Sequence, residues 1–412
     1  MRRFLHGHAT HPDWRVALGL AAAQVEAQRG ERGAAQAPTL GWVYFSDHYA
    51  AEADALVADL RQRWPGVAWV GASGIGVAAS GVEYFDEPAL ALLLAEIEPA
   101  QFRVFSGAQP LGRFAAATAN VHADPAAEDL AGLIADMSAR TSSGYLFGGL
   151  AAARGEAVHV ADAALAGGLS GVAFGAGVDV VSRVTQGCQP VGPVRKVSAA
   201  DAQVVTALDG EPALDCLLRD LGLAGADPRT ALARLRRTLV GLSDASDAAA
   251  AAHTTPRGAF DAETRVRHLI GLDTARRGIA IGDIATPGTR LAFCSRDAEA
   301  ARRDLMRICA EIREETEPEA LPLATVESLR HGGATSEDAP LAHGIAGAIY
   351  VSCSGRGGPH FGAPSAELAI VRHALGDVPL AGFFAAGEIA HHHVYGYTGV
   401  LTVFLESPAA GG

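Results

Sequence analysis

Leu40-Gly41-Trp42-Val43-Tyr44-Phe45 is a short apolar run rich in residues that favour β-structure, so it predicts a buried strand. A helical pattern follows over residues 50–63, and Val67-Ala68-Trp69-Val70-Gly71 predicts a second strand. A strand, a helix and a strand in succession indicate a βαβ unit, because parallel strands need a long crossover connection. This stretch therefore predicts an α/β fold.

The same alternation of strands and helices continues along the chain. The apolar run over residues 90–97 and the run over 144–150 predict further strands. Near the C-terminus, a strand over 347–353 precedes a helix over 365–375. We therefore expect a mixed α/β (α+β) protein with two lobes, each made of mixed sheets covered by helices. The expected divisions are an N-terminal helix and loop over 1–37, a first domain over 38–186, a second domain over 187–406 and a tail over 407–412.

Composition and charge narrow the class of protein. The chain has 412 residues, enough for two or three domains, and a formal net charge of −13. An acidic surface repels phosphate backbones, so we expect no nucleic-acid partner. No run of 18 apolar residues is free of charges, so we expect no membrane insertion. His6 and His8 interrupt any signal-peptide apolar segment, which favours a cytoplasmic protein.

The five cysteines do not form a recognisable framework. They are odd in number, lie far apart in the sequence and lack CxxC spacing. This pattern argues against a disulfide framework and against a cysteine-based zinc site.

An ordered set of short segments carries a family resemblance. These segments are Gly187-Cys188, Leu208–Leu214, Arg267–Leu272, Arg296–Ala301, Cys353–Gly357, Gly382–Phe384, Gly387–Ile389 and Gly396–Thr398. In this order they resemble the FIST domain family, in both its N-terminal and its C-terminal domain. The resemblance implies a sensory, small-ligand-binding protein of signal transduction, with an amino acid or a similar small polar molecule as ligand. Because the chain leaves no room for an output module, we expect a separate partner, a histidine kinase or a cyclic-dinucleotide enzyme.

The candidate ligand site centres on Arg356 and Glu388. Arg356 follows a buried strand and offers a planar fork suited to a carboxylate. Glu388 offers a carboxylate for an ammonium group, so together they would complement an amino acid. An internal ion pair between the two is the competing interpretation. The other candidate ligand-binding residues are Cys353, Gly357, Tyr397, Thr398 and Arg195.

Two other functions stay open at this stage. One is a hydrolase-like enzyme that uses Cys353 as nucleophile or a metal held by Glu388 and His391. His391 and His393 would share a face if their segment were one strand, which makes them the candidate metal ligands. The other is a haem-based gas sensor, which one branch of the family resembles. Some members carry a His where this chain has Tyr395, which weakens the haem interpretation, and we expect no cofactor.

Overall fold

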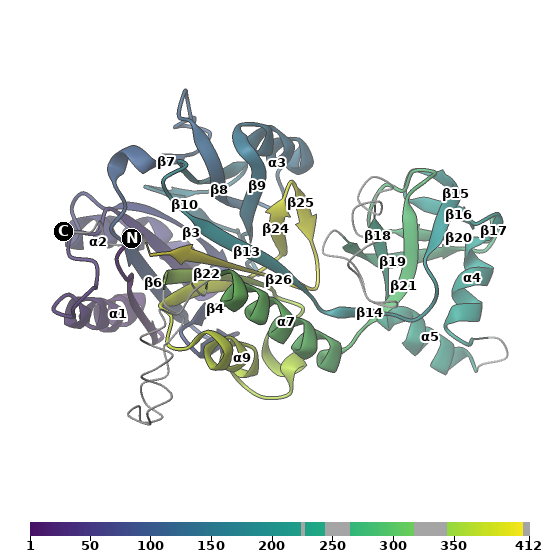
Figure 1. Ribbon diagram of the computed structural model, residues 1–412. Coiled ribbons are helices and arrows are strands. Elements are labelled where there is room, and N and C mark those ends of the chain that lie inside the picture. Colours follow the sequence, from purple (N-terminus) through teal and green to yellow (C-terminus); the bar gives the residue numbers. More distant parts are fainter. Residues whose placement is uncertain (224–226, 244–263, 317–343, 407–412) are drawn as a thin grey trace, which may run out of the picture. The chain divides into compact units, whose positions relative to one another are not determined.

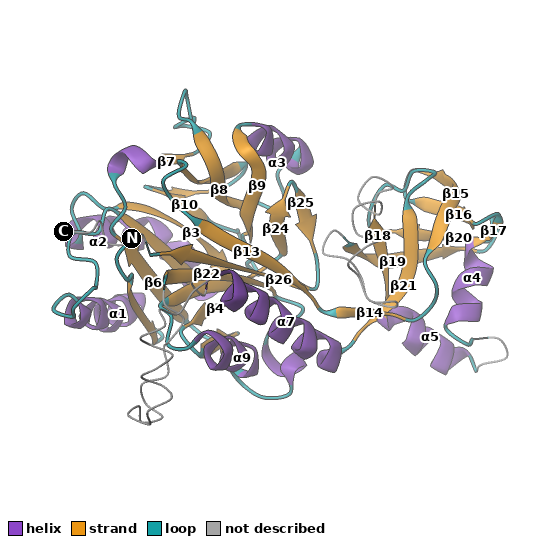
Figure 2. Cartoon of the chain, viewed as in Figure 1, coloured by secondary structure: helices purple, strands orange, loops and turns teal. Residues whose placement is uncertain are grey.

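The computed structural model describes residues 1–223, 227–243, 264–316 and 344–406, which fall into two compact units (Figure 1). The first unit is formed by Met1–Val184, Leu305–Val394 and the segment that starts at Gly399. The second unit is formed by Thr185–Asp304 and Tyr395–Thr398. Helix accounts for 27% and strand for 43% of the structure, so the mixed α/β class is confirmed (Figure 2).

The first sheet of the first unit contains the predicted βαβ unit. Strands β2 and β3 are parallel, with Leu40 opposite Ala68, and the helix α2 (Ala53–Arg63) connects them after the short helix η1 (Asp47–Glu52). The apolar residues of these strands are buried, as the run of β-formers predicted. Across the sheet the strands are β1 (Leu5–Thr10), β6 (Ala89–Ala95), β2 (Leu40–Ser46), β3 (Ala68–Gly74), β10 (His159–Ala161) and β11 (Ala164–Leu165).

Strand β1 was not predicted, because residues 1–37 were expected to hold only a helix and a loop. The helix is present as α1 (Trp14–Gln28), and Asp13 caps it by accepting from the backbone N–H of Arg15. Before it, β1 pairs antiparallel with β6, with its odd-numbered residues buried. His6 and His8 occupy the alternate positions, so histidines at the half-buried positions concealed a period-2 pattern.

A second sheet of the first unit combines strands from distant parts of the chain. Its strands β8 and β9 are parallel and are joined through the helix α3 (Leu130–Ala139). The short helix η2 (Pro99–Gln101) precedes the edge strand β7. In order, the strands are β25 (His393–Tyr395), β24 (Gly387–His391), β9 (Thr141–Leu150), β8 (Ala116–Ala123), β12 (Leu169–Phe174) and β7 (Phe102–Phe105).

The third sheet positions the candidate site. Strand β22 pairs parallel with β23, and β23 pairs antiparallel with β4 from the N-terminal part of the chain. The helix α9 (Ala366–Leu375) lies between β22 and β23 in the sequence, and the short helix η3 (Gly358–Phe361) precedes it. In order, the strands are β13 (Val180–Gln186), β26 (Thr398–Leu405), β22 (Ile345–Cys353), β23 (Leu380–Ala385), β4 (Gly76–Ala79) and β5 (Val82–Phe85).

In the second unit the strands close into a ring. Strand β18 pairs with β19 on one side and with β21 on the other. The sheet that runs from β21 through β15, β16, β20 and β19 to β18 therefore closes back onto β21. The interior is filled by apolar side chains such as Val197, Leu208 and Phe293. The strands are β14 (Cys188–Pro190), β21 (Arg290–Arg296), β15 (Arg195–Asp201), β16 (Val204–Leu208), β20 (Gly278–Ile281), β19 (Arg265–Asp273), β18 (Thr238–Ser243) and β17 (Glu211–Pro212), with helices α4 (Ala213–Asp220) and α5 (Pro228–Arg237).

The compact units divide the chain differently from the expected domains. The second unit begins at Thr185, close to the expected boundary between 186 and 187. Residues 305–394, however, group with the first unit rather than with the barrel-like ring, and the helix α7 (Ala298–Thr316) spans this second division. The reason is strand pairing, since β22, β23 and β26 complete a sheet with β4 and β13. The expected tail over 407–412 lies outside the described residues.

Candidate functional site

A tight turn follows β22 and shapes the loop that carries Arg356. The carbonyl of Cys353 accepts from the backbone N–H of Arg356 at 2.8 Å and from that of Gly357 at 3.1 Å. Gly357 is needed here for packing, because a Cβ at this position would lie 2.4 Å from Cε2 of Phe85 and 2.6 Å from the ring of Phe384. The turn therefore places the loop directly against the aromatic side chain at the end of β5.

Arg356 points into the protein, where it meets a carboxylate. Its Nε donates to Oε1 of Glu367 at 2.7 Å, and the two side chains are 1% and 0% exposed. The same carboxylate accepts from the hydroxyl of Tyr350 at 2.6 Å and from the hydroxyl of Ser352. A buried ion pair of this kind is stable only when its remaining polar atoms are hydrogen-bonded, as these donors provide for Glu367.

Glu83 of β5 is the second buried carboxylate of the site. Its Oε1 accepts from the backbone N–H groups of Glu367 at 2.9 Å and of Leu368 at 3.1 Å, in the first turn of α9. In return, the backbone N–H of Glu83 donates to the hydroxyl of Ser365 at 3.0 Å. Ser365 precedes α9 but does not cap it with its own side chain, so Glu83 supplies the cap from a different part of the chain.

The two carboxylates influence each other. Burial, and after it repulsion by Glu367, raises the pKa of Glu83 to about 7 against the lowering effect of the two amide hydrogen bonds. Burial, followed by the nearby Glu367, also raises the pKa of the Tyr350 hydroxyl, which therefore stays a proton donor to Glu367. Glu83 is thus a carboxyl group whose charge state changes near neutral pH.

A cavity of about 390 Å³ opens beside this network. It is lined by Glu83, Phe85, Glu87, Gly358, Gly362, Ala363, Pro364 and Ser365. Its volume lies within the range of small-molecule sites in proteins. Because Glu83 both lines the cavity and caps α9, an occupant of the cavity would touch a side chain that holds a helix of the first unit.

A larger hollow of about 860 Å³ lies at the C-terminal end of α2, lined among others by Arg61, Gln62 and Asp162. Its Arg61 and Gln62 are exposed, and no charged side chain of its described lining is fully buried. We place the candidate site at the smaller cavity, because a charge that is buried at the wall of a cavity is the more specific sign of a ligand site.

Comparison with known proteins identifies the family. The model of the FIST N domain matches residues 39–211, and the model of the FIST C domain matches residues 213–391. This chain belongs to the FIST family. FIST domains are sensory domains of signal transduction. The junction between the two matches falls at β17, inside the second unit, so the two FIST domains do not coincide with the two compact units.

Mycobacterial relatives match nearly the whole chain. The "Uncharacterized protein Rv0628c" of Mycobacterium tuberculosis (strain ATCC 25618 / H37Rv) is 30% identical over 97% of this chain and 99% of its own length. The "Uncharacterized protein Mb0898c" of Mycobacterium bovis is 29% identical over 97% of this chain and 98% of its own length.

The residues predicted from the FIST resemblance divide between the two units. Cys353, Arg356, Gly357 and Glu388 belong to the first unit, whereas Arg195, Tyr397 and Thr398 belong to the second. Arg356 was expected to contact a carboxylate, and the carboxylate at its Nε is that of Glu367. Glu388 is fully buried in β24, opposite Gly149 of β9, and its pairing with Arg356 stays a prediction. None of the seven lines the cavity in the part of the chain that the structure describes.

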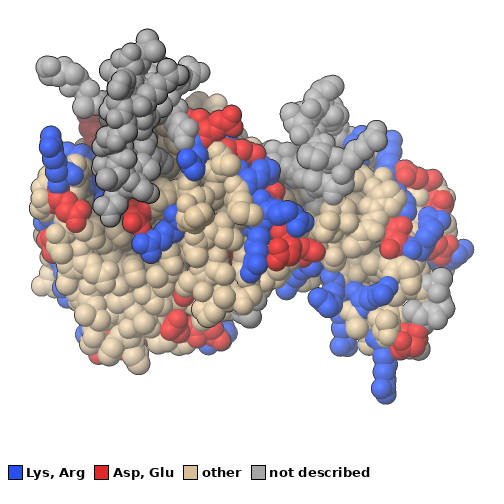
Figure 3. All heavy atoms as spheres, turned by 60° about the horizontal axis from the view of Figure 1, so that its bottom comes forward, with Lys and Arg blue, Asp and Glu red and all other residues tan. Residues whose placement is uncertain are grey.

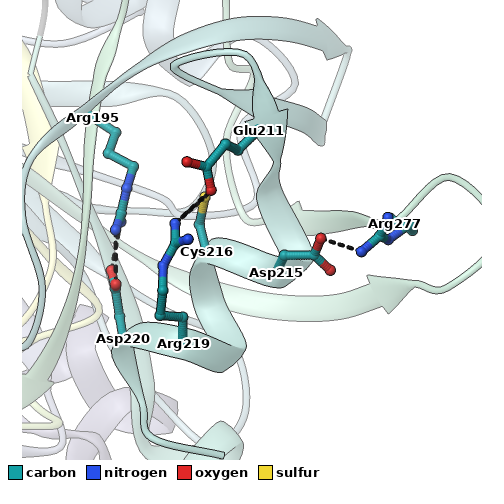
Figure 4. Close-up of polar contacts among 7 residues, drawn as sticks. All are labelled: Arg195, Glu211, Asp215, Cys216, Arg219, Asp220 and Arg277. Atoms are coloured by element: carbon teal, nitrogen blue, oxygen red, sulfur yellow. Dashed lines mark hydrogen bonds and ion pairs between the residues drawn. The ribbon is translucent and has the colours of Figure 1, made fainter. Parts of the chain in front are cut away.

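In the second unit, the predicted side chains contact partners of their own. Arg195 donates two hydrogen bonds of 2.5 and 2.8 Å to the carboxylate of Asp220. Figure 4 shows the two side chains pointing toward each other. Arg219 donates to Glu211 beside Cys216, and burial raises the pKa of the Cys216 thiol. The hydroxyl of Tyr397 lies 2.9 Å from Nε2 of His268, and the guanidinium of Arg296 lies over its ring. Thr398 is fully buried at the start of β26.

The shared face of His391 and His393 was conditional on their segment being one strand. His391 ends β24 with a φ of 54°, His392 forms a turn and His393 begins β25. His391 and His393 therefore lie on different strands, so the period-2 argument does not apply to them, and their role as metal ligands stays a prediction. Among the residues that the structure describes, no group of three His, Cys, Asp or Glu side chains is arranged to hold a metal ion.

Glu83 and Glu367 are the site residues that the sequence did not point to. Glu83 sits within the strand Val82–Phe85, and Glu367 in the first turn of α9, where an acidic residue usually interacts with the helix dipole in solvent. An isolated Glu inside an otherwise apolar and aromatic strand is the only local signal that could have marked Glu83. The 284 residues between the two explain why the contact itself had no sequence signal.

Proposed function

We propose that this FIST protein is a noncatalytic sensor that binds a small polar ligand in the cavity between β5 and the loop before α9. The sensory character of the family and the carboxylate-lined cavity support this proposal. Signal output would pass to a separate partner, a histidine kinase or an enzyme of cyclic-dinucleotide metabolism. We propose the cytoplasm as its location, and no described helix is both long and apolar enough to cross a membrane.

The observation that carries the proposal is the double role of Glu83. Glu83 lines the cavity, and its Oε1 accepts hydrogen bonds from two amides in the first turn of α9, those of Glu367 and Leu368. A ligand that attracts or displaces the Glu83 carboxylate would therefore change the hydrogen bonding at the start of α9. Loops and helix ends held by few contacts are the parts of proteins whose equilibria ligands shift most readily.

The arrangement around Cys353 does not favour the enzyme alternative. The side chain is 8% exposed and is not part of the described lining of the cavity, so its thiol does not face a bound ligand there. A small cavity lined by carboxylates also suits a small polar compound better than the large apolar macrocycle of haem.

A ligand screen by thermal shift tests this proposal. The purified protein would be screened against amino acids, amines and carboxylic acids, together with the variant Ala363→Trp, whose indole would fill the cavity from its exposed wall. We expect at least one class to raise the Tm of the wild type, and to have no effect on Ala363→Trp. Ala126→Trp, at an exposed position, is the matched control and should respond like the wild type.

The proposal fails if no compound raises the Tm. It also fails if the compounds that do so act equally on Ala363→Trp, since they would then bind elsewhere.

A further inference from the structure

The walls of the cavity carry charge of one sign. Two carboxylates, those of Glu83 and Glu87, and the ring of Phe85 line it, and its described lining contains no Lys or Arg. Arg356, the cation nearest in the sequence to the loop, lies inside the buried network with its Nε on Glu367. A ligand carboxylate in this cavity would meet two like charges without a described cation to offset them.

Glu83 has one oxygen available to a ligand. The side chain is 8% exposed, and both amide hydrogen bonds of α9 go to Oε1. Within the described residues Oε2 accepts no hydrogen bond, although the side chain lies at the cavity wall. Oε2 is not among the described buried polar atoms that lack a partner, so it is reached from the cavity and can accept a charge-assisted hydrogen bond from an occupant.

The ring of Phe85 is fixed in place at the same wall. Its edge-to-face contact with Phe384 has a centroid distance of 5.0 Å, and Gly357 and Gly358 approach it so closely that a Cβ on either would clash. A cation within about 6 Å of an aromatic ring is attracted by the negative face of the ring, more so when water is excluded. A rigid ring beside two carboxylates is a combination that proteins use for organic cations.

The distribution of charge along the chain also favours a positively charged ligand. Residues 185–304 contain 16 Lys and Arg against 15 Asp and Glu, whereas the rest of the sequence contains 17 against 31. The acidic excess therefore belongs to the part of the chain that builds the cavity. Both signs are nevertheless interspersed on the face drawn in Figure 3, so the field is diffuse rather than a single acidic patch. Such a field raises the local concentration of cations.

We infer that the cavity takes a small organic cation, an amine or guanidinium compound, held by the carboxylates of Glu83 and Glu87 and by the ring of Phe85. This inference rests on the proposed function and narrows its ligand class from small polar molecules in general to cations. It disfavours zwitterionic amino acids, whose carboxylate would have no described cation to contact in this cavity.

Binding of a cation should displace a proton. Among the described residues, the charged groups around Glu83 include Glu367 in the first turn of α9, Glu87 in the lining of the same cavity, and Arg356, which contacts Glu367. With its pKa at about 7, Glu83 is partly protonated at neutral pH, and a cation at Oε2 would favour the ionised form. Affinity for a cation should therefore rise with pH through neutrality.

Isothermal titration calorimetry with four compounds of equal chain length tests the inference. The probes are 1,4-diaminobutane, butylamine, 4-aminobutanoate and butanoate, which differ in charge and little in shape. We expect affinity to fall in that order, with butanoate at least tenfold weaker than butylamine. Glu83→Gln should weaken butylamine about tenfold, whereas the exposed control Glu128→Gln should leave it unchanged.

The two proposals fail in different ways. If butanoate or 4-aminobutanoate binds best and Ala363→Trp abolishes that binding, the cation inference is overturned and the cavity sensor stands. If neither amine binds, the cation inference is likewise overturned. If Ala363→Trp weakens the binding of no compound from this series or from the wider screen, both proposals fail.

Proton release supplies a readout that affinity alone does not. In buffers of different ionisation enthalpy at neutral pH, butylamine binding should release part of one proton from the wild type and none from Glu83→Gln. Equal release by both would overturn the role of Glu83.

Discussion

Oε1 of Glu83 accepts the backbone N–H of Glu367 at 2.9 Å, so a carboxylate of one strand caps a helix at a residue 284 positions later in the chain. The side chain of Glu367 in turn holds Arg356, Tyr350 and Ser352. The contact therefore joins β5, β22 and α9 around two buried carboxyl groups. Its consequences for stability and binding can be measured.

The stability of the protein should depend on pH through Glu83. Because the pKa of this group is raised from 4.5 to about 7, the folded state keeps a proton that the unfolded state has lost. The contribution of Glu83 to stability therefore falls as pH rises between these values, by about 3 kcal/mol in total, and is constant above them. Glu83→Gln cannot ionise and loses this dependence. In thermal unfolding across this range, the Tm of Glu83→Gln minus the Tm of the wild type should increase as pH rises. A difference in Tm that stays constant with pH would contradict the prediction.

Removing the charge of Glu367 should lower the free energy of unfolding of the protein. Glu367→Gln leaves the buried guanidinium of Arg356 without the carboxylate at its Nε, and breaking such a pair costs about 3 kcal/mol or more. The double variant Arg356→Met with Glu367→Leu removes both charges, so it should recover part of that loss in urea unfolding. The exposed Glu128→Gln should stay within about 0.5 kcal/mol of the wild type. If the double variant is less stable than Glu367→Gln, the broken ion pair is not the main cause of the lost stability.

Gly357→Ala should destabilise the site through a clash with two aromatic rings. The added methyl group would lie 2.4 Å from Cε2 of Phe85 and 2.6 Å from the ring of Phe384, and overpacking of this kind costs about 1–3 kcal/mol. In a Phe85→Leu background the clash with Phe384 remains and the clash with residue 85 is relieved, so the same substitution should lower stability by less than in the wild type. Denaturant unfolding of the four proteins measures the coupling, and additive losses would contradict the proposed clash.

Arg195 should prove to be a structural residue. Its guanidinium and the carboxylate of Asp220 are 10% and 4% exposed, and the two-pronged geometry requires arginine. Arg195→Lys should therefore lower stability by about 1–2 kcal/mol, since a lysine cannot make both bonds. Butylamine affinity should be unchanged, because Arg195 does not line the cavity. A loss of affinity without a loss of stability would restore the ligand-binding role that the sequence suggested.

The parts of the fold that depend on local pattern could be predicted. The alternation over residues 40–71 specified strand, helix and strand, and β2 and β3 are indeed parallel. Strand β1 was hidden by histidines at its half-buried positions. The pairing of β4 with β23, and the closure of β18 onto β21, join segments far apart in the sequence, and no local pattern encodes such contacts.

The same distinction applies to the candidate site. Arg356 was a candidate because it lies in a small-residue loop after a buried strand and offers a planar fork suited to a carboxylate. Its partner Glu367 resembles any acidic residue in the first turn of a helix, and Glu83 resembles a solvent-facing position of an edge strand. Only the folded arrangement buries both. For His391 and His393, the period-2 argument required one continuous strand, and the turn at His392 divides that strand.

A crystal structure of the protein grown with butylamine would show whether the cavity holds an organic cation. We expect ordered density for the amine in the cavity, with its nitrogen within hydrogen-bond distance of Oε2 of Glu83 and beside the ring of Phe85. An empty cavity at a concentration that saturates binding in calorimetry, with the amine ordered elsewhere in the molecule, would contradict this expectation.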